Sequence, residues 1–185
     1  VTAVVPYLPG GRQDKRKGHE REGVSTGLFA RMLAAAGCDM VITVEPHNEA
    51  MIGCFAPREV VFESVQVTRP FAHFLREQGL RPDVVASTDV GGLERARHYA
   101  EQFGCGLAAL SKQRDYSQTS VVTNTTVIGD VRDKSVLVVD DIIDTAGSVC
   151  AAVRTLWDEG ATNIVVAGVH LVLSGGGCDR LQALH

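Results

Sequence analysis

The fold of this chain is decided by residues 136–148, which read VLVVDDIIDTAGS. The four apolar residues at 136–139 are typical of a strand that is buried on both faces of a parallel sheet. The adjacent carboxyl groups of Asp140 and Asp141 come at the end of that strand. Small and hydroxyl-bearing residues at 144–148 then open a helix. This order of strand, acidic pair, turn and helix predicts one β–α unit of a parallel sheet.

The flanking sequence repeats the alternation of strands and helices. We expect strands at residues 1–5, 40–44, 83–87, 106–110, 121–131, 135–139 and 163–169, and helices at 25–36, 70–78, 93–103 and 146–159. Such alternation predicts an α/β fold in which helices cover both faces of parallel sheets. The polar, aperiodic stretch 111–120 is interpreted as a mobile loop. The weakest stretch, 56–69, separates two α/β units, so we expect domains at 1–67 and 68–185.

Composition excludes several classes of protein. The 185 residues are 45% apolar and 22% charged, which is typical of a folded globular chain. Lys and Arg number 18 against 22 Asp and Glu, so the net charge of −4 argues against a nucleic-acid partner. No apolar run approaches the ~20 residues that cross a bilayer, which argues against a membrane partner. Five scattered cysteines without a CxxC pair predict neither a zinc site nor a disulfide framework, and they favour the cytoplasm.

The acidic pair and the turn after it predict a site for a sugar phosphate. Two adjacent carboxylates at the end of a buried strand are costly unless they accept hydrogen bonds or face a cation. Sugar hydroxyls are suitable donors, and Mg²⁺ is a suitable cation. Backbone N–H groups and hydroxyls at the start of a helix bind phosphate. The alternative is that the acids only cap the helix, but one cap needs one carboxylate and three acids occur in five residues.

The same stretch resembles the phosphoribosyl-diphosphate binding signature. That signature consists of four apolar residues, two acids, two apolar residues and then Asp-Thr-x-Gly followed by Ser or Thr. Type I phosphoribosyltransferases and ribose-phosphate pyrophosphokinases share it, so the signature alone does not choose between them. Ala146 departs from the Gly or Cys that is common at its position.

Other segments resemble the pyrophosphokinase family alone. Residues 6–15 (PYLPGGRQDK) resemble its ATP-site signature, and 43–47 (TVEPH) resemble the strand end whose His helps to hold the Mg²⁺ of MgATP. Residues 87–92 (STDVGG) resemble its Ser-Pro-Asp-x-Gly-Gly segment, and 112–114 (KQR) match the Lys-x-Arg of its catalytic loop. Each segment has a plainer alternative when it is taken singly. Residues 6–15 and 112–114 could be solvated loops, the first of them basic, His47 could be a packed or surface histidine, and residues 87–92 could be a turn that caps a helix. They occur in the family order, at nearly its spacing, through to Gly175, and the chain is therefore identified as a member of the ribose-phosphate pyrophosphokinase family.

The resemblance implies an enzyme, a transferase that is type I phosphoribosyltransferase-like in fold. It would move the diphosphoryl group of MgATP to the anomeric oxygen of ribose 5-phosphate, giving 5-phosphoribosyl 1-diphosphate and AMP for nucleotide biosynthesis. Mg²⁺ is the implied cofactor. The implied catalytic residues are Lys112 and Arg114, and the implied metal ligands are His47 and Asp89. The implied ATP-binding residues are Arg12, Gln13, Asp14 and His47. The implied ribose 5-phosphate-binding residues are Arg114, Asp140, Asp141, Asp144, Thr145, Ala146, Gly147 and Ser148.

Two alternatives remain open. A type I phosphoribosyltransferase would share the loop at 144–148 but would have no use for residues 12–14 and His47. A non-catalytic regulatory subunit would have a disrupted catalytic loop, and the presence of Lys112 and Arg114 counts against it.

The resemblance also concerns assembly and length. The family forms homo-oligomers built from dimers, which extend to rings such as a hexamer. The chain resembles the central part of the usual family length, so we expect 1–67 to be the C-terminal part of an ATP-side domain. We expect 68–185 to be a phosphoribosyltransferase-like domain that is incomplete at its C-terminus. Our hypothesis is that this piece alone is inactive.

Overall fold

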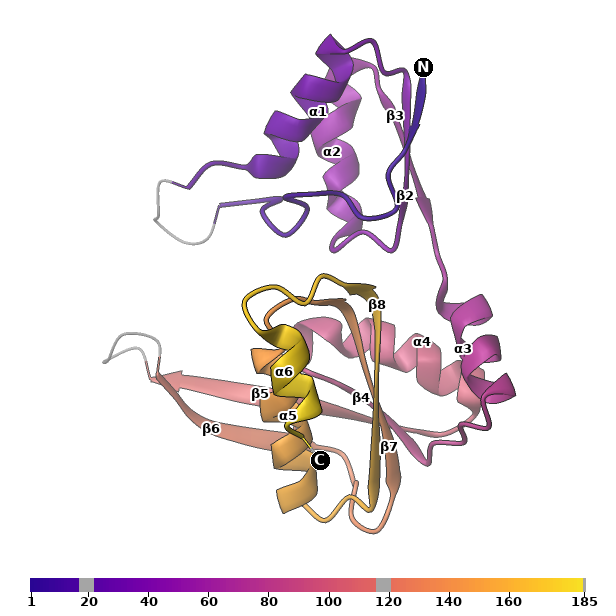
Figure 1. Ribbon diagram of the computed structural model, residues 1–185, viewed down its shortest axis with the longest axis vertical. Helices are drawn as coiled ribbons and strands as arrows, with labels where there is room; N and C mark the ends of the chain where they lie inside the picture. The colour runs from indigo at the N-terminus through magenta and orange to yellow at the C-terminus, as the bar shows by residue number, and fades with distance from the viewer. Residues whose placement is uncertain (17–21, 116–120, 185) are drawn as a thin grey trace. The chain divides into compact units, whose positions relative to one another are not determined.

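The protein is described by a computed structural model that covers residues 1–16, 22–115 and 121–184. The chain divides between Val67 and Thr68 into two compact units, and each unit is described by itself. The first unit contains the strands β1 (Thr2–Val4), β2 (Met40–Val44) and β3 (Val61–Val65), the helices α1 (Ser25–Ala35) and α2 (Ile52–Phe55), and the 3₁₀ turns η1 (Glu49–Met51) and η2 (Ala56–Arg58) (Figure 1).

The first unit is a parallel sheet in the order β1-β2-β3 with its helices on one face. Residues from α1 and α2 join Val41 and Phe62 of the strands in one apolar cluster, where Phe55 stacks on Phe62 with ring centroids 4.7 Å apart. Val61 and Val65, which alternate with Phe62, are nearly half-exposed. Both crossovers advance in the same direction along the sheet, and right-handed crossovers then place both helices on the same face. The expectation of helices on both faces is therefore wrong for the described part of this sheet.

The second unit is a five-stranded sheet in the order β6-β5-β4-β7-β8. Its strands are β4 (Val84–Ser87), β5 (Gly106–Asp115), β6 (Val121–Ile128), β7 (Ser135–Ile143) and β8 (Asn163–Leu171). Its helices are α3 (Thr68–Glu77), α4 (Leu93–Phe103), α5 (Gly147–Asp158) and α6 (Gly177–Gln182), and η3 (Val90–Gly92) is a 3₁₀ turn. All neighbouring strands are parallel except β6, which is antiparallel to β5.

Helices cover both faces of this second sheet, as the sequence predicts. Val138 of β7 belongs to the same apolar cluster as Leu156 of α5, whereas its neighbour Leu137 belongs to the cluster of Tyr99 in α4. Successive side chains of a strand point to opposite faces, so α4 and α5 lie on opposite sides of β7. The crossover from β4 to β5 runs in the opposite direction to that from β7 to β8. The strand order therefore reverses between β4 and β7, and ligands of open α/β sheets bind at such a point, beyond the carboxyl ends of the strands.

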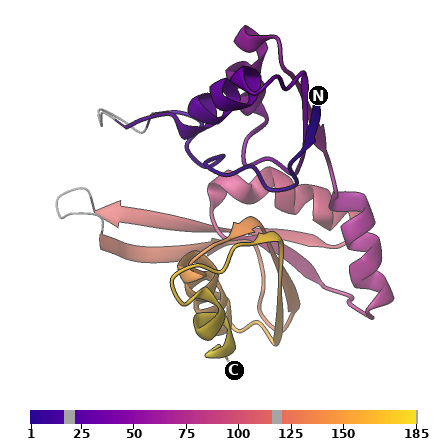
Figure 2. The same cartoon turned by 45° about the horizontal axis from the view of Figure 1, so that its top comes forward.

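Three strands extend further than the sequence predicts: β5, β7 and, by two residues to Leu171, β8. β5 continues to Asp115, and its backbone pairs with β6, with Lys112 opposite Thr125 and Arg114 opposite Val122. The interpretation of 111–115 as loop is wrong, because backbone pairing with a neighbouring strand does not require an apolar pattern. Residues 116–120 of that expected loop lie outside the described residues. β7 likewise continues through the acidic pair, with Asp140 opposite Gly168 of β8. Figure 2 shows β5 and β6 projecting as a two-stranded ribbon from the rest of the second unit.

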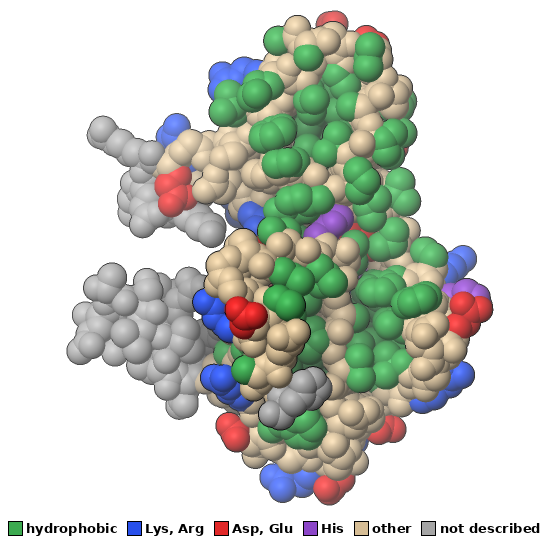
Figure 3. Space-filling model, viewed as in Figure 1, with side chains coloured by type: hydrophobic (Ala, Val, Ile, Leu, Met, Phe, Trp, Pro, Cys, Tyr) green, Lys and Arg blue, Asp and Glu red, His purple; other side chains and the backbone are tan. Residues whose placement is uncertain are grey.

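The surface of the first unit carries many exposed apolar side chains. Figure 3 shows hydrophobic side chains over much of the face of this unit that is turned to the viewer. The large hydrophobic residues exposed in this unit are Val1, Val4, Leu28, Met32, Ile52, Val61 and Val65. Among the described residues, no helix has the length and apolar character needed to cross a membrane.

Candidate functional site

The carboxyl ends of β4 and β7 bring together two of the segments singled out from the sequence. These strands are parallel neighbours with Ser87 opposite Val139, so the residues that follow, Thr88 and Asp140, reach the same edge of the sheet. The Thr88 hydroxyl donates a hydrogen bond to Asp140 Oδ2 at 3.1 Å. The segment at 87–92 and the acidic pair therefore form one site at the reversal of strand order.

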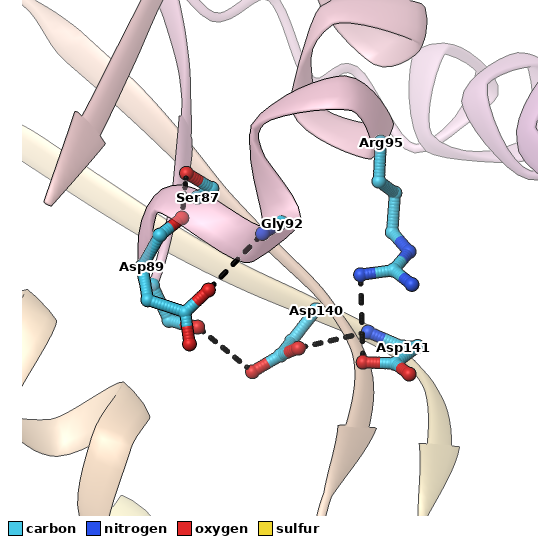
Figure 4. Close-up of polar contacts among 7 residues, drawn as sticks. Ser87, Asp89, Gly92, Arg95, Asp140 and Asp141 are labelled. Carbon is cyan, nitrogen blue, oxygen red and sulfur yellow. Dashed lines mark hydrogen bonds and ion pairs between the residues drawn. The ribbon is translucent and has the colours of Figure 1, made fainter. Parts of the chain in front are cut away.

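The two carboxyl groups of the acidic pair have different surroundings. The Asp141 N–H donates to Asp140 Oδ1 at 3.0 Å, while Asp141 Oδ1 lies 3.4 Å from Arg95 Nη1 of α4. The Arg95 and Asp141 side chains are only 18% and 5% exposed. Figure 4 shows the Arg95 side chain extending from its helix toward Asp141. Sequence reasoning missed Arg95, because no pattern distinguishes it from the other basic residues of that helix.

Burial, reinforced by the hydrogen bond and the charge of Asp141, raises the pKa of Asp140 to about 7. The Thr88 hydrogen bond and the Arg95 charge act in the opposite direction and are too weak to prevent the rise. Asp140 can therefore gain and lose a proton near neutral pH. A group of this kind can exchange a hydrogen bond with a sugar hydroxyl in either protonation state.

Asp89 acts as a cap in this structure. Its Oδ1 accepts from the Gly92 N–H at 3.0 Å, and its carbonyl accepts from the Ser87 hydroxyl at 2.7 Å, which closes the turn around η3 (Figure 4). The alternative interpretation of this segment as a turn and cap thus describes its local structure. A metal-binding role for Asp89 remains a prediction.

The loop at 144–148 forms a tight turn that leads into α5. Ala146 adopts the left-handed conformation with φ 60°, and the helix begins at Gly147, one residue later than expected. Asp144 accepts a hydrogen bond from the Ser174 hydroxyl, and the Thr145 carbonyl accepts one from Arg180 Nη1 at 2.6 Å. Backbone N–H groups at the start of a helix can bind a phosphate, so the turn fits the predicted anion site. Sequence reasoning assigned no role to Ser174 or Arg180.

In the first unit, hydrogen bonds hold the residues predicted to bind ATP. The Thr26 hydroxyl donates to the Gly10 carbonyl at 3.2 Å, and the Ser25 hydroxyl donates to Gln13 Oε1. Asn48 Nδ2 donates to Asp14 Oδ2 at 2.7 Å. The last bond brings the segment at 12–14 next to the one that contains His47, as one ATP site would require. Sequence reasoning missed Asn48, which lies beside the histidine without a signal of its own.

Glu45 serves the backbone at the end of β2. It adopts φ 39°, its N–H donates to the Val65 carbonyl at 3.1 Å, and its carboxylate accepts from the Val67 N–H at 3.0 Å. The side chain is buried, and its hydrogen bond holds the end of the first unit. Within the described residues, no group of three or more His, Cys, Asp and Glu is arranged as a metal cluster.

The predicted site residues are distributed over both units. Arg12, Gln13, Asp14 and His47 belong to the first unit, and Asp89, the acidic pair and the loop at 144–148 belong to the second. The backbone of Lys112 and Arg114 lies on β5, and their side chains lie outside the part of the chain that the structure describes.

The second unit has the architecture of a phosphoribosyl transferase domain, and the model of that family matches residues 63–181. The chain belongs to the phosphoribosyl transferase domain family. Its curated relatives include the ribose-phosphate pyrophosphokinases of Helicobacter pylori and Burkholderia pseudomallei. The first is 36% identical over 182 residues, covering 98% of this chain and 55% of the relative, and the second is 36% identical over 183 residues, covering 99% and 56%.

A solved structure supports the same assignment. The phosphoribosylpyrophosphate synthetase of Mycobacterium smegmatis matches with a TM-score of 0.85 and 32% identity, covering 97% of this chain and 57% of that one. The resemblance to ribose-phosphate pyrophosphokinases is thus confirmed, and so is the α/β fold class. The chain spans about half the length of the relatives it matches.

Proposed function

We propose that the protein is a ribose-phosphate pyrophosphokinase, which transfers the diphosphoryl group of MgATP to the anomeric oxygen of ribose 5-phosphate. The products are 5-phosphoribosyl 1-diphosphate and AMP. The observation that carries the choice of this enzyme is the hydrogen bond from Asn48 to Asp14, which joins the two segments of the first unit that resemble the pyrophosphokinases alone. The acidic pair and the turn at 144–148, at the end of one strand, support a sugar-phosphate site in either candidate enzyme. Similarity to relatives named ribose-phosphate pyrophosphokinase along nearly the whole chain supports it.

Ribose 5-phosphate binds to the second unit in this proposal. Its phosphate accepts hydrogen bonds from the backbone and hydroxyl groups of Asp144, Thr145, Ala146, Gly147 and Ser148. Its ring hydroxyls donate to Asp140 and Asp141. Arg95 orients the Asp141 carboxyl group, so that the sugar meets one carboxyl that is held by a guanidinium group and one, Asp140, that can carry a proton.

ATP binds through Arg12, Gln13, Asp14 and His47. A guanidinium group pairs with phosphate or stacks on a base, and an amide reads the edge of adenine. Mg²⁺ is the proposed cofactor: His47 of the first unit and Asp89 of the second are each proposed as a Mg²⁺ ligand, with substrate phosphates as further ligands, and bound Mg²⁺ would neutralise phosphate charge. One carboxylate suffices for such a site, because Mg²⁺ usually keeps several waters and takes one or two carboxylates plus phosphates.

Lys112 and Arg114 supply the catalytic charge. The reaction forms a bond between the anomeric oxygen and the β-phosphorus and breaks the bond between the β-phosphorus and the α–β bridging oxygen, which leaves with AMP. The proton of the anomeric hydroxyl is released to solvent. Such transfers depend on alignment and on cations that stabilise charge developing in the transition state. Arg114 also contacts ribose 5-phosphate in this proposal.

The test is the appearance of AMP from ATP and ribose 5-phosphate, with Mg²⁺ and no nucleobase, catalysed by the intact protein. We expect activity in the wild type and in Asp130→Ala, a control at a surface acid that pairs with Lys134 at 2.8 Å. We expect a loss of about 100-fold or more in Asp141→Ala, since the buried Arg95 would be left without its partner beside the substrate. No AMP from an intact, folded wild type would refute the proposal.

A type I phosphoribosyltransferase is the second candidate, because the matched family model covers the part of the chain that such enzymes share. This candidate predicts release of diphosphate from 5-phosphoribosyl 1-diphosphate only when a nucleobase or another nitrogenous acceptor is added. It predicts no ATP consumption. Binding to an active synthetase without any turnover would instead indicate a regulatory subunit.

We include a homo-oligomer built from dimers, and a cytoplasmic location, in the proposal. The exposed apolar side chains of the first unit support association, because such surface often marks an interface. The proposed location rests on the five scattered cysteines of the sequence, which contain no CxxC pair, a spacing that favours a reducing compartment.

A further inference from the structure

The segment after β8 lies against the turn that is proposed to bind phosphate. The N–H groups of Val172 and Leu173 both donate to the Ile143 carbonyl, at 2.9 and 3.1 Å. Further along, Leu181 and Leu184 pack on the apolar cluster that contains Ala146 of the turn. The downstream segment at 172–184 is therefore attached at one end by backbone bonds to the last residue of β7, just before the turn, and at the other end by apolar packing against the turn.

Within this segment, Gly177 fits directly against the turn. A Cβ added at this glycine would lie 2.4 Å from the Asp144 carbonyl oxygen, closer than real atoms approach. The Ser174 hydroxyl donates to the carboxylate of the same aspartate. The start of α6 thus contacts the turn with no intervening side chain, which leaves the turn little room to shift.

Arg180 determines the direction of one peptide group in the turn. Its Nη1 donates to the Thr145 carbonyl at 2.6 Å. In a planar trans peptide the C=O and N–H bonds point in opposite directions, so the Ala146 N–H points away from Arg180. A cation on the carbonyl also polarises the peptide and strengthens its N–H as a donor.

We propose that Arg180 is a positioning residue that fixes the Thr145–Ala146 peptide, so that the Ala146 N–H is presented to the 5-phosphate of the sugar. This inference rests on the proposed function of the turn. Arg180 acts through the Thr145 carbonyl and does not itself touch the substrate. Its effect is therefore confined to the affinity for ribose 5-phosphate, while binding of ATP in the first unit is unchanged.

The test compares Arg180→Ala, Arg180→Lys and the wild type in the intact protein. Loss of a hydrogen bond from a charged donor predicts that Arg180→Ala weakens ribose 5-phosphate binding roughly tenfold, with the KM for ATP unchanged. Arg180→Lys, which can still donate to the carbonyl, recovers most of the affinity. Arg154→Ala, at an exposed arginine of α5, is the matched control and binds like the wild type.

A second measurement separates this inference from the proposed function. The amide ¹H–¹⁵N signal of Ala146 in the ligand-free protein is expected to shift in Arg180→Ala and to return toward the wild-type position in Arg180→Lys. If the wild type bound no ribose 5-phosphate, the proposed function would fail even though this signal still reported on the peptide. Unchanged affinity with an unchanged signal in Arg180→Ala would overturn the positioning role. An equal loss of ribose 5-phosphate and ATP affinity, with a lower melting temperature, would also overturn it, since that pattern indicates a merely structural residue.

Discussion

Arg95 Nη1 and Asp141 Oδ1 lie 3.4 Å apart, and both side chains are largely buried. The contact joins the first turn of α4 to β7, through two residues that are more than forty positions apart in sequence. Asp141 therefore has a buried guanidinium partner, whereas its neighbour Asp140 has no Lys or Arg partner at ion-pair distance within the described residues. One helix residue therefore makes the two adjacent acids chemically unequal.

Replacement of Arg95 by alanine is expected to destabilise the protein by about 3 kcal/mol, because breaking a buried pair leaves an uncompensated charge. Arg97→Ala is the matched control on the same helix. Arg97 pairs with Glu94 and Glu101 on the surface, and such pairs contribute about 0.5 kcal/mol. Chemical denaturation of both variants measures the difference. Equal free energies of unfolding for the two variants would show that the buried Arg95–Asp141 pair stabilises the protein no more than a surface pair does.

The raised pKa of Asp140 predicts a pH-dependent contribution to stability. The native state binds this proton more tightly than the unfolded chain, so the contribution is full below about pH 4 and is lost as the pH rises through about 7. Asp140→Asn removes this titration. The melting temperature of the variant minus that of the wild type should therefore increase by ~5 °C when the pH is raised from 5 to 8.

Asp130→Asn is the control for that comparison. Hydrogen bonding to Lys134 lowers the pKa of this exposed acid, so its titration falls below pH 5. We expect its melting curve to stay parallel to that of the wild type between pH 5 and pH 8. Parallel behaviour of Asp140→Asn over the same range would contradict the raised pKa.

Asn48→Ala tests the ATP side. Loss of the 2.7 Å bond to Asp14 should free the segment at 12–14 and raise the KM for ATP roughly tenfold, while the KM for ribose 5-phosphate stays constant. Ser64→Ala removes a hydrogen bond to Glu49 elsewhere in the same unit, and steady-state kinetics should show no change. A rise in both KM values for Asn48→Ala would indicate general disorder of the unit.

Lys112→Ala tests the proposed catalytic charge. Loss of a cation that acts on the transition state should lower kcat by about 100-fold or more, with ribose 5-phosphate binding close to that of the wild type. Lys134→Ala, at a lysine that pairs with Asp130, is the control. Turnover by Lys112→Ala at the wild-type rate would remove this lysine from the mechanism.

Local sequence patterns were sufficient to predict elements in both units. The helix at 93–103 and the strand at 40–44 have the expected bounds, because a glycine or an apolar run marks their ends. The extension of β5 to Asp115 could not be predicted, since it depends on pairing with β6 and the residues themselves are polar. The helices of the first unit lie on one face of its sheet because of the order of the strands, and local sequence patterns do not reveal that order.

The acidic pair and its turn were predictable because their residue types are costly or unusual at the end of a buried strand. The residues that hold them in place were not. Each of these residues contacts a partner more than thirty positions away in the sequence, and no local pattern marks it. They are Arg95, Asn48 and Arg180. The roles proposed for Lys112, Asp89 and His47 came from resemblance and remain predictions.

Ala146 carries a backbone geometry, φ 60°, that side-chain-bearing residues rarely adopt. The left-handed region costs an alanine about 1 kcal/mol that a glycine would not incur. Replacing Ala146 by glycine would remove this backbone strain. The gain in stability would be offset by the greater conformational entropy of the unfolded chain. Alanine at this position allows the turn fewer backbone conformations than glycine would in the ligand-free protein. Binding of the proposed sugar phosphate would therefore cost less conformational entropy.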